Sequence, residues 1–258
     1  MDQASTAAKR ERRTTRDIGD HGAGSGHDAR VQFRTVAAPA LDEALALQLG
    51  VLLGRAYTDE RHLKAYPPDL LAQLTPDIER VHAAPPDRRE LMPAEYLSQF
   101  PTLRNARKPA AERRQALHFI AEAEGYVASH VSLWPQFFDF AGAQVQGGYI
   151  EDVATDPLHL GEDLAVRGMR EAERRARDLG LGLLGLATGL AGYYERLGWL
   201  LWDGEHHFRT SGREGMHLDQ PLYLLPLDAA GERITTGSGV IQSWRLQRFG
   251  DSVAGANW

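Results

Sequence analysis

Cysteine is absent from the 258 residues of this chain. The absence excludes disulfides, a thiol nucleophile and thiolate metal ligands. The sequence also lacks an apolar run close to the roughly 18 residues of a membrane-spanning helix. Its basic N-terminus is not followed by the apolar segment of a secretory signal. We therefore expect a cytoplasmic protein without a membrane partner.

An excess of positive charge is missing as well. The formal net charge is -6 at pH 7 and the isoelectric point is near 5.9, so nucleic acid is not an expected partner. The ten histidines include no HExxH pattern, and G-x-S-x-G does not occur. The sequence therefore predicts neither a metal site nor the nucleophile elbow of a serine hydrolase.

The chain divides into a tail and one domain. Residues 1–30 are polar and rich in charged residues and glycine, which predicts a disordered N-terminal tail. Residues 31–258 are expected to form a single domain. Within it, the proline-rich segment at about 82–114 is longer than an ordinary loop and is predicted to be an insertion. Either a binding element or a partly disordered surface segment fits this insertion.

The centre of the chain runs from Gly147 to Trp202. Apolar and polar residues alternate over Gly148–Thr155, which predicts a strand that ends at Asp156-Pro157. Because successive strand residues face opposite sides, Glu151 and Asp152 should point apart. The following elements are predicted to be a helix at Glu162–Asp178, a buried strand at Leu181–Ala187, a short helix at Ala191–Leu197 and a strand at Gly198–Trp202.

The flanking segments supply further elements. Before the centre, we predict a strand at Val31–Val36, a helix from Pro39 to Tyr57, a helical region at Arg61–Val81, and a hairpin of Ala116–Ala123 and Tyr126–Trp134 through Glu124-Gly125. Phe137, Phe138 and Phe140 are expected at a turn. After the centre, the predictions are a polar loop at Asp203–Gln220, a strand at Pro221–Pro226, and a strand or turn of helix at Val240–Arg248.

The order strand, loop, helix, strand, short helix, strand resembles the core of the GCN5-related N-acetyltransferases (GNAT superfamily). The segment YYERLGW resembles the Y-x-x-x-G-[WF] element of that superfamily. More narrowly, GYIEDVATDP, YYERLGWLLWDG and the terminal Trp258 resemble the aminoglycoside 2'-N-acetyltransferases. The resemblance is best over about residues 115–227, together with the terminus.

This resemblance implies an α/β fold with a mixed, mainly antiparallel, central sheet and helices on both faces. It implies an acyl-CoA-dependent N-acetyltransferase that uses acetyl-CoA as co-substrate. The acceptor would be a small amine-bearing molecule, for example an aminoglycoside-like antibiotic. The resemblance leaves a homodimer open.

The resemblance also implies roles for individual residues. Glu151 matches a general base or substrate ligand, and Tyr194 matches the acid that protonates the coenzyme A sulfur. Asp152, Val153 and Ala154 belong to the strand whose backbone would bind the thioester and pantetheine. The Trp258 carboxylate, also a candidate catalytic group, and Asp152 are expected near the acceptor amine. Ala256 replaces an acidic substrate-binding residue that the resemblance implies two positions before the end. Asp251 is the candidate to substitute for it, although nothing in the sequence aligns it there. A core aromatic (Tyr194), solvated carboxylates and a frayed terminus stay open as alternatives.

One loop departs from the pattern that the resemblance implies. The superfamily holds the coenzyme A pyrophosphate with backbone N–H groups in the sequence Arg/Gln-x-x-Gly-x-Gly/Ala. The corresponding cofactor-binding residues here are Gly161, Glu162, Asp163, Leu164 and Ala165, after Leu160 in place of the cation. Two carboxylates therefore lie where phosphates would bind. A second interpretation stays open: a repurposed protein on this fold, without acetyl-CoA chemistry, that binds a small molecule or acts in natural-product metabolism.

Overall fold

The computed structural model describes residues 31–58, 72, 75–76, 79, 83, 100–190, 192–210, 213–217 and 220–250. The predicted N-terminal tail lies outside these residues. So do most of the predicted helical region Arg61–Val81 and the part of the insertion between residues 84 and 99. Asp251 and Trp258, two of the predicted acceptor-binding residues, also lie outside them.

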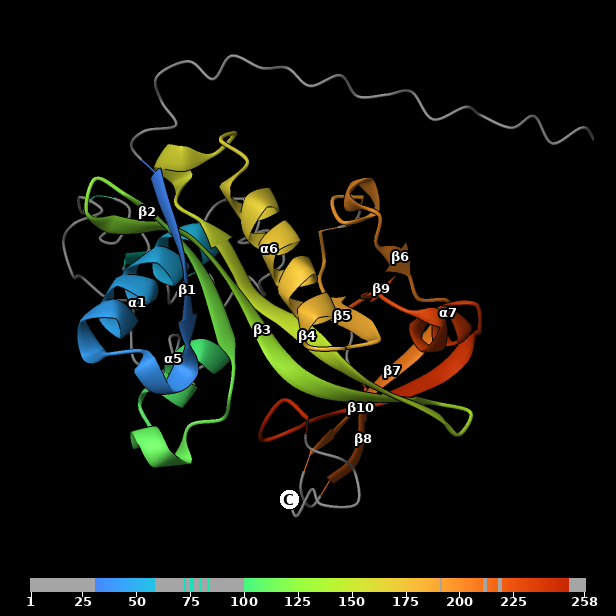
Figure 1. Cartoon of the computed structure of the whole chain (residues 1–258). Helices are drawn as coiled ribbons and strands as arrows, with labels where there is room; N and C mark the ends of the chain where they lie inside the picture. Colours follow the sequence, from blue (N-terminus) through green and yellow to red (C-terminus); the bar gives the residue numbers. More distant parts are fainter. Residues whose placement is uncertain are drawn as a thin grey trace, which may run out of the picture.

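Two long paired strands lie at the centre of the sheet, as Figure 1 shows: β3 (Tyr126–Phe140) and β4 (Ala143–Thr155). The predicted hairpin of β2 (Leu117–Ala123) and β3 is confirmed, with positive φ angles of 53° at Glu124 and 87° at Gly125 in its turn. The predicted turn at the phenylalanines is wrong. Phe138 is fully buried within β3, and the chain turns at Ala141-Gly142 instead.

The described strands form one sheet that confirms the expected fold class. Its order is β6 (Leu200–Leu201), β9 (Leu222–Pro226), β5 (Leu183–Ala187), β4, β3, β10 (Gly239–Arg245), β7 (Gly204–Thr210) and β8 (Arg213–His217). β2 pairs with the first half of β3, and β1 (Val31–Ala37) pairs with β2. The pairs β4–β5 and β10–β7 are parallel, and the other pairs are antiparallel. The sheet is therefore mixed and mainly antiparallel.

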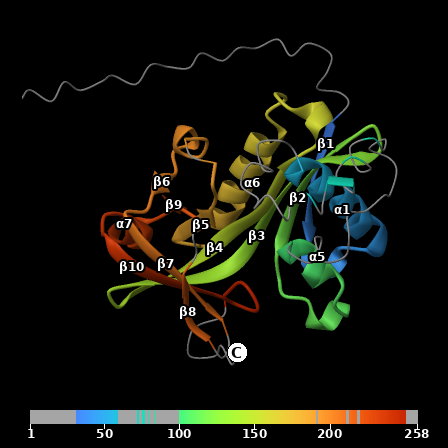
Figure 2. The same ribbon diagram turned by 180° about the vertical axis from the view of Figure 1, so that it is seen from behind.

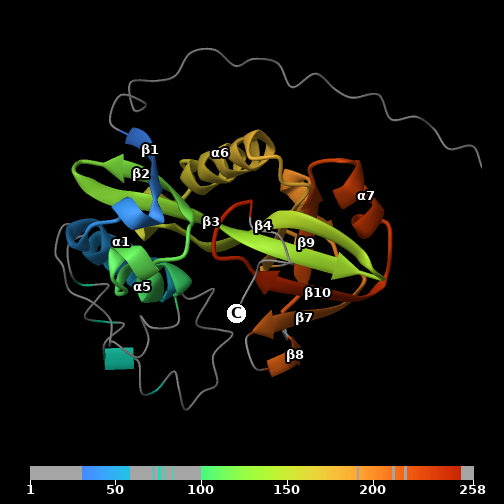
Figure 3. The ribbon, with the colours of Figure 1, turned by 60° about the horizontal axis from the view of Figure 1, so that its bottom comes forward.

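Helices cover both faces of this sheet. α6 (Leu164–Asp178) lies on one face, and α1 (Glu43–Tyr57) and α5 (Pro101–Ala106) lie on the other (Figures 2 and 3). Alternate strand residues serve the two sides, because successive side chains of a strand point to opposite faces. Phe119 packs in the cluster with Met169 of α6, whereas its neighbour Ile120 packs in the cluster with Leu49 of α1.

Several segments differ from the predictions. The predicted polar loop after Trp202 contains β7 and β8, because backbone pairing of β7 with β10 supports a strand that its polar side chains do not signal. The predicted helix at 191–197 is only the 3₁₀ turn η5 (Glu195–Leu197), and α6 begins at Leu164. α7 (Ala229–Thr235) was not predicted. The remaining short turns are η2 (Ala38–Ala40), η3 (Ala110–Glu112) and η4 (Pro157–His159).

Candidate functional site

The parallel strands β4 and β5 separate in the middle of the sheet. They pair from Gly147–Leu183 to Tyr149–Gly185 and no further. Beyond this point β4 continues beside β3, and the end of β5 pairs with β9. The ladder between β4 and β5 therefore ends at Tyr149, and β4 from Ile150 onward pairs with β3 alone. A Cβ on Gly147 would lie 2.2 Å from the carbonyl oxygen of Leu183, so glycine permits the close approach before the strands part.

A β-bulge interrupts β4 just beyond this point. Ser132 of β3 pairs with Glu151, and His130 pairs with Ala154, so β4 has one more residue than β3 over this interval. Asp152 in the bulge has a φ of 52°, in the left-handed region that residues with a Cβ seldom adopt. The surrounding structure must therefore hold this conformation in place.

Buried hydrogen bonds hold the bulge on both its side chain and its carbonyl. The Asp152 carboxylate accepts from the backbone N–H of Thr102 at 2.9 Å. Nδ1 of His130 lies 2.8 Å from the Asp152 carbonyl oxygen, which only accepts, so Nδ1 carries the proton. Nε2 of His130 then accepts from Nδ1 of His118 at 3.0 Å. Burial lowers the pKa of both histidines, that of His130 to about 4, so both are neutral at pH 7.

The bulge overturns one prediction about the two carboxylates. Glu151 and Asp152 were expected on opposite faces, but both side chains lie on the face that α1 and α5 cover. Asp152 turns towards Thr102 of α5, and Glu151 meets Arg245, whose guanidinium lies over the Trp134 ring on that same face. The regular alternation fails because Asp152 has a positive φ angle. The two carboxylates therefore belong to one site.

Glu151 forms a nearly buried ion pair with Arg245. Nη2 of Arg245 donates to Oε1 of Glu151, and each side chain is 14% exposed. Burial raises the pKa of Glu151 to about 7, with a further rise from Asp152, and Arg245 opposes the rise. Oε2 of Glu151 is buried and has no hydrogen-bond partner in the described part of the chain. A carboxylate with such a pKa and an unused oxygen is suited to general base catalysis near neutral pH.

Tyr194 lies on the opposite face of the sheet from Glu151. It is 5% exposed and packs with Ile150, Trp199 and Tyr223 in the cluster beneath α6. Burial raises the pKa of Tyr194, so its hydroxyl is protonated at neutral pH and can donate. Its position is compatible with both predictions, a catalytic acid and a core aromatic.

The loop after β4 is fixed at its start and has an uncommon conformation at its end. Asp156 is buried and forms an ion pair with Arg55 of α1, with a shortest distance of 2.7 Å. Oε2 of Glu162 lies 3.0 Å from Nδ1 of His159. Asp163 precedes α6 with a φ of 55°, and its side chain does not cap the helix. The Asp163 carboxylate therefore does not occupy the first backbone N–H groups of α6. These N–H groups could bind a phosphate despite the nearby negative charge.

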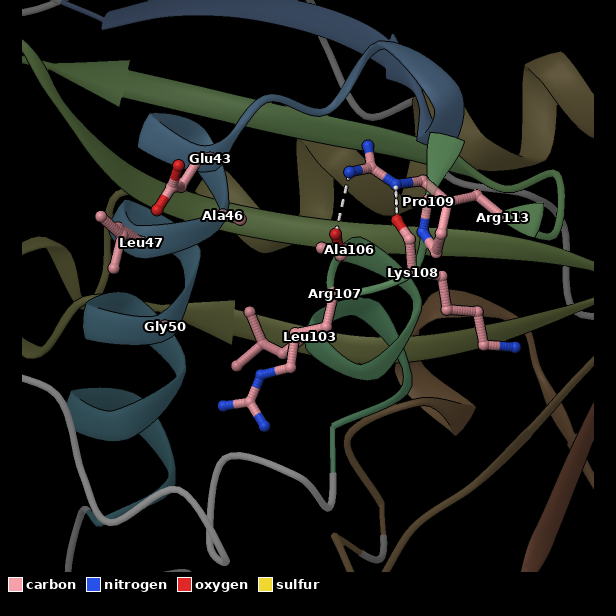
Figure 4. Close-up of a pocket in the computed structure, with 10 residues that line it drawn as sticks. All are labelled: Glu43, Ala46, Leu47, Gly50, Leu103, Ala106, Arg107, Lys108, Pro109 and Arg113. Atoms are coloured by element: carbon pink, nitrogen blue, oxygen red, sulfur yellow. Dashed lines mark hydrogen bonds between the residues drawn. The ribbon is translucent and has the colours of Figure 1, made fainter. Parts of the chain in front are cut away.

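A separate pocket of about 530 Å³ lies between α1 and α5, away from these residues (Figure 4). The guanidinium of Arg113, which lines this pocket, donates hydrogen bonds to backbone carbonyls. Nη2 lies 2.9 Å from the Ala106 oxygen and Nε lies 3.0 Å from the Lys108 oxygen. None of the predicted site residues within the described part of the chain lines this pocket. The lining residues are Glu43, Ala46, Leu47, Gly50, Leu103, Ala106, Arg107, Lys108, Pro109 and Arg113.

The features above coincide with a match to a protein family. Residues 82–199, slightly less than half of the chain, match the model of the acetyltransferase (GNAT) family. The match contains the bulged strand, the loop before α6 and Tyr194. It supports the expected superfamily, an N-acetyltransferase, and acetyl-CoA as co-substrate. No curated protein matches the sequence.

Solved acetyltransferase structures resemble the chain at low identity. A GNAT family N-acetyltransferase from Escherichia coli in complex with CoA has a TM-score of 0.44 and 18% identity, over 83% of this chain and 89% of that one. A GNAT family acetyltransferase from Brucella melitensis in complex with acetyl-CoA has values of 0.42 and 15%, over 82% and 94%. A mutant agmatine N-acetyltransferase has values of 0.44 and 18%, over 77% and 100%. These values assign no acceptor, and closeness to the aminoglycoside 2'-N-acetyltransferases is not shown.

The sequence predictions missed three residues of this site. His118, His130 and Arg245 were not singled out, although each had a signal. His130 belongs to the polar face of the predicted strand Tyr126–Trp134, and that face is buried against α1 and α5. Arg245 follows Ile241 and Ser243 at every second position, so it continues the buried face of β10.

Proposed function

We propose that this chain acetylates an amine of a small molecule with acetyl-CoA, and that aminoglycoside-like antibiotics are among the acceptors to test. The observation that carries the proposal is Glu151. Its carboxylate has a pKa raised to about 7 and belongs to the bulged part of β4, just beyond the point where β4 and β5 stop pairing. The family match over residues 82–199 supports the same reaction class.

Backbone groups of two segments would hold the co-substrate. Val153 and Ala154, after the bulge, would orient the thioester and pantetheine, and the loop Gly161–Ala165 would hold the phosphates through N–H groups. Acetyl-CoA, when bound, supplies an acetyl group that is activated as a thioester. The left-handed conformation of Asp163 leaves the start of α6 uncapped by its side chain, which favours this arrangement.

Two side chains would accept and donate the protons of the reaction. An amine is mostly an ammonium ion at pH 7, so it must lose a proton before it attacks a carbonyl carbon. Oε2 of Glu151 would accept that proton, directly or through a water molecule. The Tyr194 hydroxyl would supply a proton to the departing sulfur. Asp251 and the Trp258 carboxylate remain proposed acceptor contacts, and extending the chain past Trp258 should weaken acceptor binding more than it lowers turnover.

The test is thiol release from acetyl-CoA, together with mass detection of the acetylated product. The panel contains aminoglycosides, diamines and amino acids, and Glu151→Gln is the matched variant. The proposal expects an increase of 42 mass units, the mass of an added acetyl group, on at least one amine, and a large loss of rate in Glu151→Gln.

A different result would favour the second candidate function. The carboxylates of Glu162 and Asp163 beside the proposed phosphate site favour a fold that has lost acetyl-CoA chemistry, because like charges repel. A folded protein that releases no thiol with any amine, and that does not bind acetyl-CoA, would contradict the transferase and support this repurposed binding protein.

A further inference from the structure

Three arginines interact electrostatically with the carboxylate of Glu151. Arg245 of β10 is ion-paired with it, and Arg104 of α5 and Arg114 after η3 lie within electrostatic range. Asp152 is the second carboxylate of the described part of this site. With both carboxylates ionised, three positive charges face two negative ones, and the described part of the site keeps a net positive charge. Protonation of Glu151 increases that excess.

Arg114 is positioned through its backbone, which leaves its guanidinium available. The buried amide of Asn105 donates from Nδ2 to the Arg114 carbonyl at 3.0 Å and accepts from the Arg114 N–H at 2.9 Å. The next residue, Gln115, donates its N–H to the carbonyl of Gln247 at 3.0 Å, which joins this segment to the chain just after Arg245. In the described part of the structure, the Arg114 guanidinium has no hydrogen bond and no ion pair.

The charge of Arg114 is also poorly compensated. Burial lowers the pKa of Arg114, and so do the charges of Arg245 and Arg104, whereas Glu151 raises it. A bound anion would relieve this repulsion, and an arginine guanidinium matches a carboxylate with two parallel hydrogen bonds.

A buried amide beside Arg245 is unsatisfied as well. Gln136 of β3 lies directly opposite Arg245 in the antiparallel register, so both side chains point to the same face of the sheet. The residue is fully buried, yet neither Nε2 nor Oε1 of Gln136 has a hydrogen-bond partner in the described part of the chain. Buried polar atoms without partners are uncommon, so the pair Gln136 and Arg245 indicates a place for a polar ligand group.

We infer that the acceptor is an amino carboxylic acid, whose amine meets Glu151 and whose carboxylate is bound by Arg114 with help from Arg104 and Gln136. This inference rests on the proposed function and specifies its acceptor. An acceptor that carries only amines adds positive charge to a site that already has an excess of it. An amino acid adds the missing negative charge and the amine together.

The experiment compares amino acids with the amines left when their carboxylate is removed: lysine with cadaverine, ornithine with putrescine, histidine with histamine, and tyrosine with tyramine. For at least one pair, kcat/KM should favour the amino acid by about 10- to 100-fold, the range of a hydrogen bond between charged groups. Arg114→Gln should reduce that preference to near one. Arg233→Gln, an exposed arginine of α7, is the matched control and should retain it.

Binding is measured separately, as the shift of Tm that each compound produces in the wild type and in Arg114→Gln. If no compound is acetylated but an amino acid stabilises the wild type and not Arg114→Gln, the transferase proposal fails, and the binding of an amino carboxylic acid through Arg114 stands without it. The inference is overturned if each amine produces the same shift of Tm as its amino acid, or is acetylated with the same kcat/KM. It is also overturned if Arg114→Gln keeps the preference, or if no amino acid of the panel binds.

Discussion

Nδ1 of His130 donates a hydrogen bond to the carbonyl oxygen of Asp152 at 2.8 Å, at the bulged residue of β4. The two residues come from neighbouring strands, and His118 supports the imidazole from the far side. Nε2 of His130 can accept from His118 only while His130 is neutral, and burial disfavours the charged form of both rings. The backbone beside the proposed acetyl site therefore depends on two uncharged imidazoles.

Acid should destabilise the fold through this pair. The pKa of His130 is lowered to about 4 and that of His118 is lowered well below 6.5, so the unfolded chain binds these protons first as the pH falls. The stability that the pair contributes is present above about pH 6.5 and is lost towards pH 4. Each histidine should lower the free energy of unfolding by up to about 1.4 kcal/mol per pH unit. Urea unfolding between pH 7 and pH 5 measures the slope.

His130→Gln is the variant that tests this assignment. It should unfold with a shallower dependence on pH than the wild type, because one titrating group is gone. An unaltered slope in His130→Gln would show that the buried pair does not control acid stability.

Glu151→Gln should lower turnover by roughly 10²–10⁴-fold, the usual range for a general base. In the wild type, kcat/KM should rise as the pH is raised through about 7, because burial raises the pKa of Glu151 to that value and only the ionised form accepts a proton. The variant should lack this rise. Equal pH profiles for the two proteins would exclude Glu151 as the base.

Local pattern predicted much of the fold around these residues. The hairpin turn at Glu124-Gly125 and the alternation in Tyr126–Trp134 depend on neighbouring residues, so they were visible in the sequence. The polar strand β7 was not, because its pairing with β10 comes from residues some 35 positions later in the chain. β7 therefore forms a strand because it pairs with β10, although its own side-chain pattern does not predict one.

The bulge at Asp152 and the pairing of Glu151 with Arg245 could not be predicted from local pattern either. The sequence around Asp152 alternates like a regular strand. Its left-handed φ depends on contacts with Thr102 and His130, which are 50 and 22 residues away. The partner of Glu151 is 94 residues away. Glu151 itself was identified by resemblance, whereas its environment needed the three-dimensional arrangement of β4, α5 and β10.

Tyr194→Phe distinguishes a catalytic acid from a core aromatic. The substitution keeps the ring that packs against Trp199 and Tyr223 and removes only the hydroxyl. Turnover should fall by about 10²-fold or more while Tm changes little. Tyr193→Phe, the adjacent half-buried tyrosine, is the control and should retain turnover. Similar rates for the two variants would assign Tyr194 to packing alone.

Asp156→Ala should destabilise the protein by about 1.5–3 kcal/mol, because it removes a buried carboxylate that accepts a charged hydrogen bond from the Arg55 guanidinium. Both side chains of this pair are less than 7% exposed. Arg34→Met, which removes an exposed ion pair with Glu122, is the comparison and should cost far less. Chemical denaturation measures both. Equal small losses would mean that the Arg55–Asp156 pair does not anchor α1 to the end of β4.

Calorimetric titration with acetyl-CoA tests the central claim most directly, because it asks whether β4 beyond Ile150 and the loop before α6 bind the co-substrate. The measurement uses the wild type, a Glu162→Gly/Asp163→Gly double variant, and a Glu171→Gln/Asp178→Asn control that removes the same charge elsewhere on α6. The account predicts saturable one-to-one binding to the wild type. It also predicts binding roughly fivefold tighter in the double variant, since removing the repulsion is worth on the order of 1 kcal/mol, and no change in the control. No saturable heat with any of the three folded proteins would contradict it.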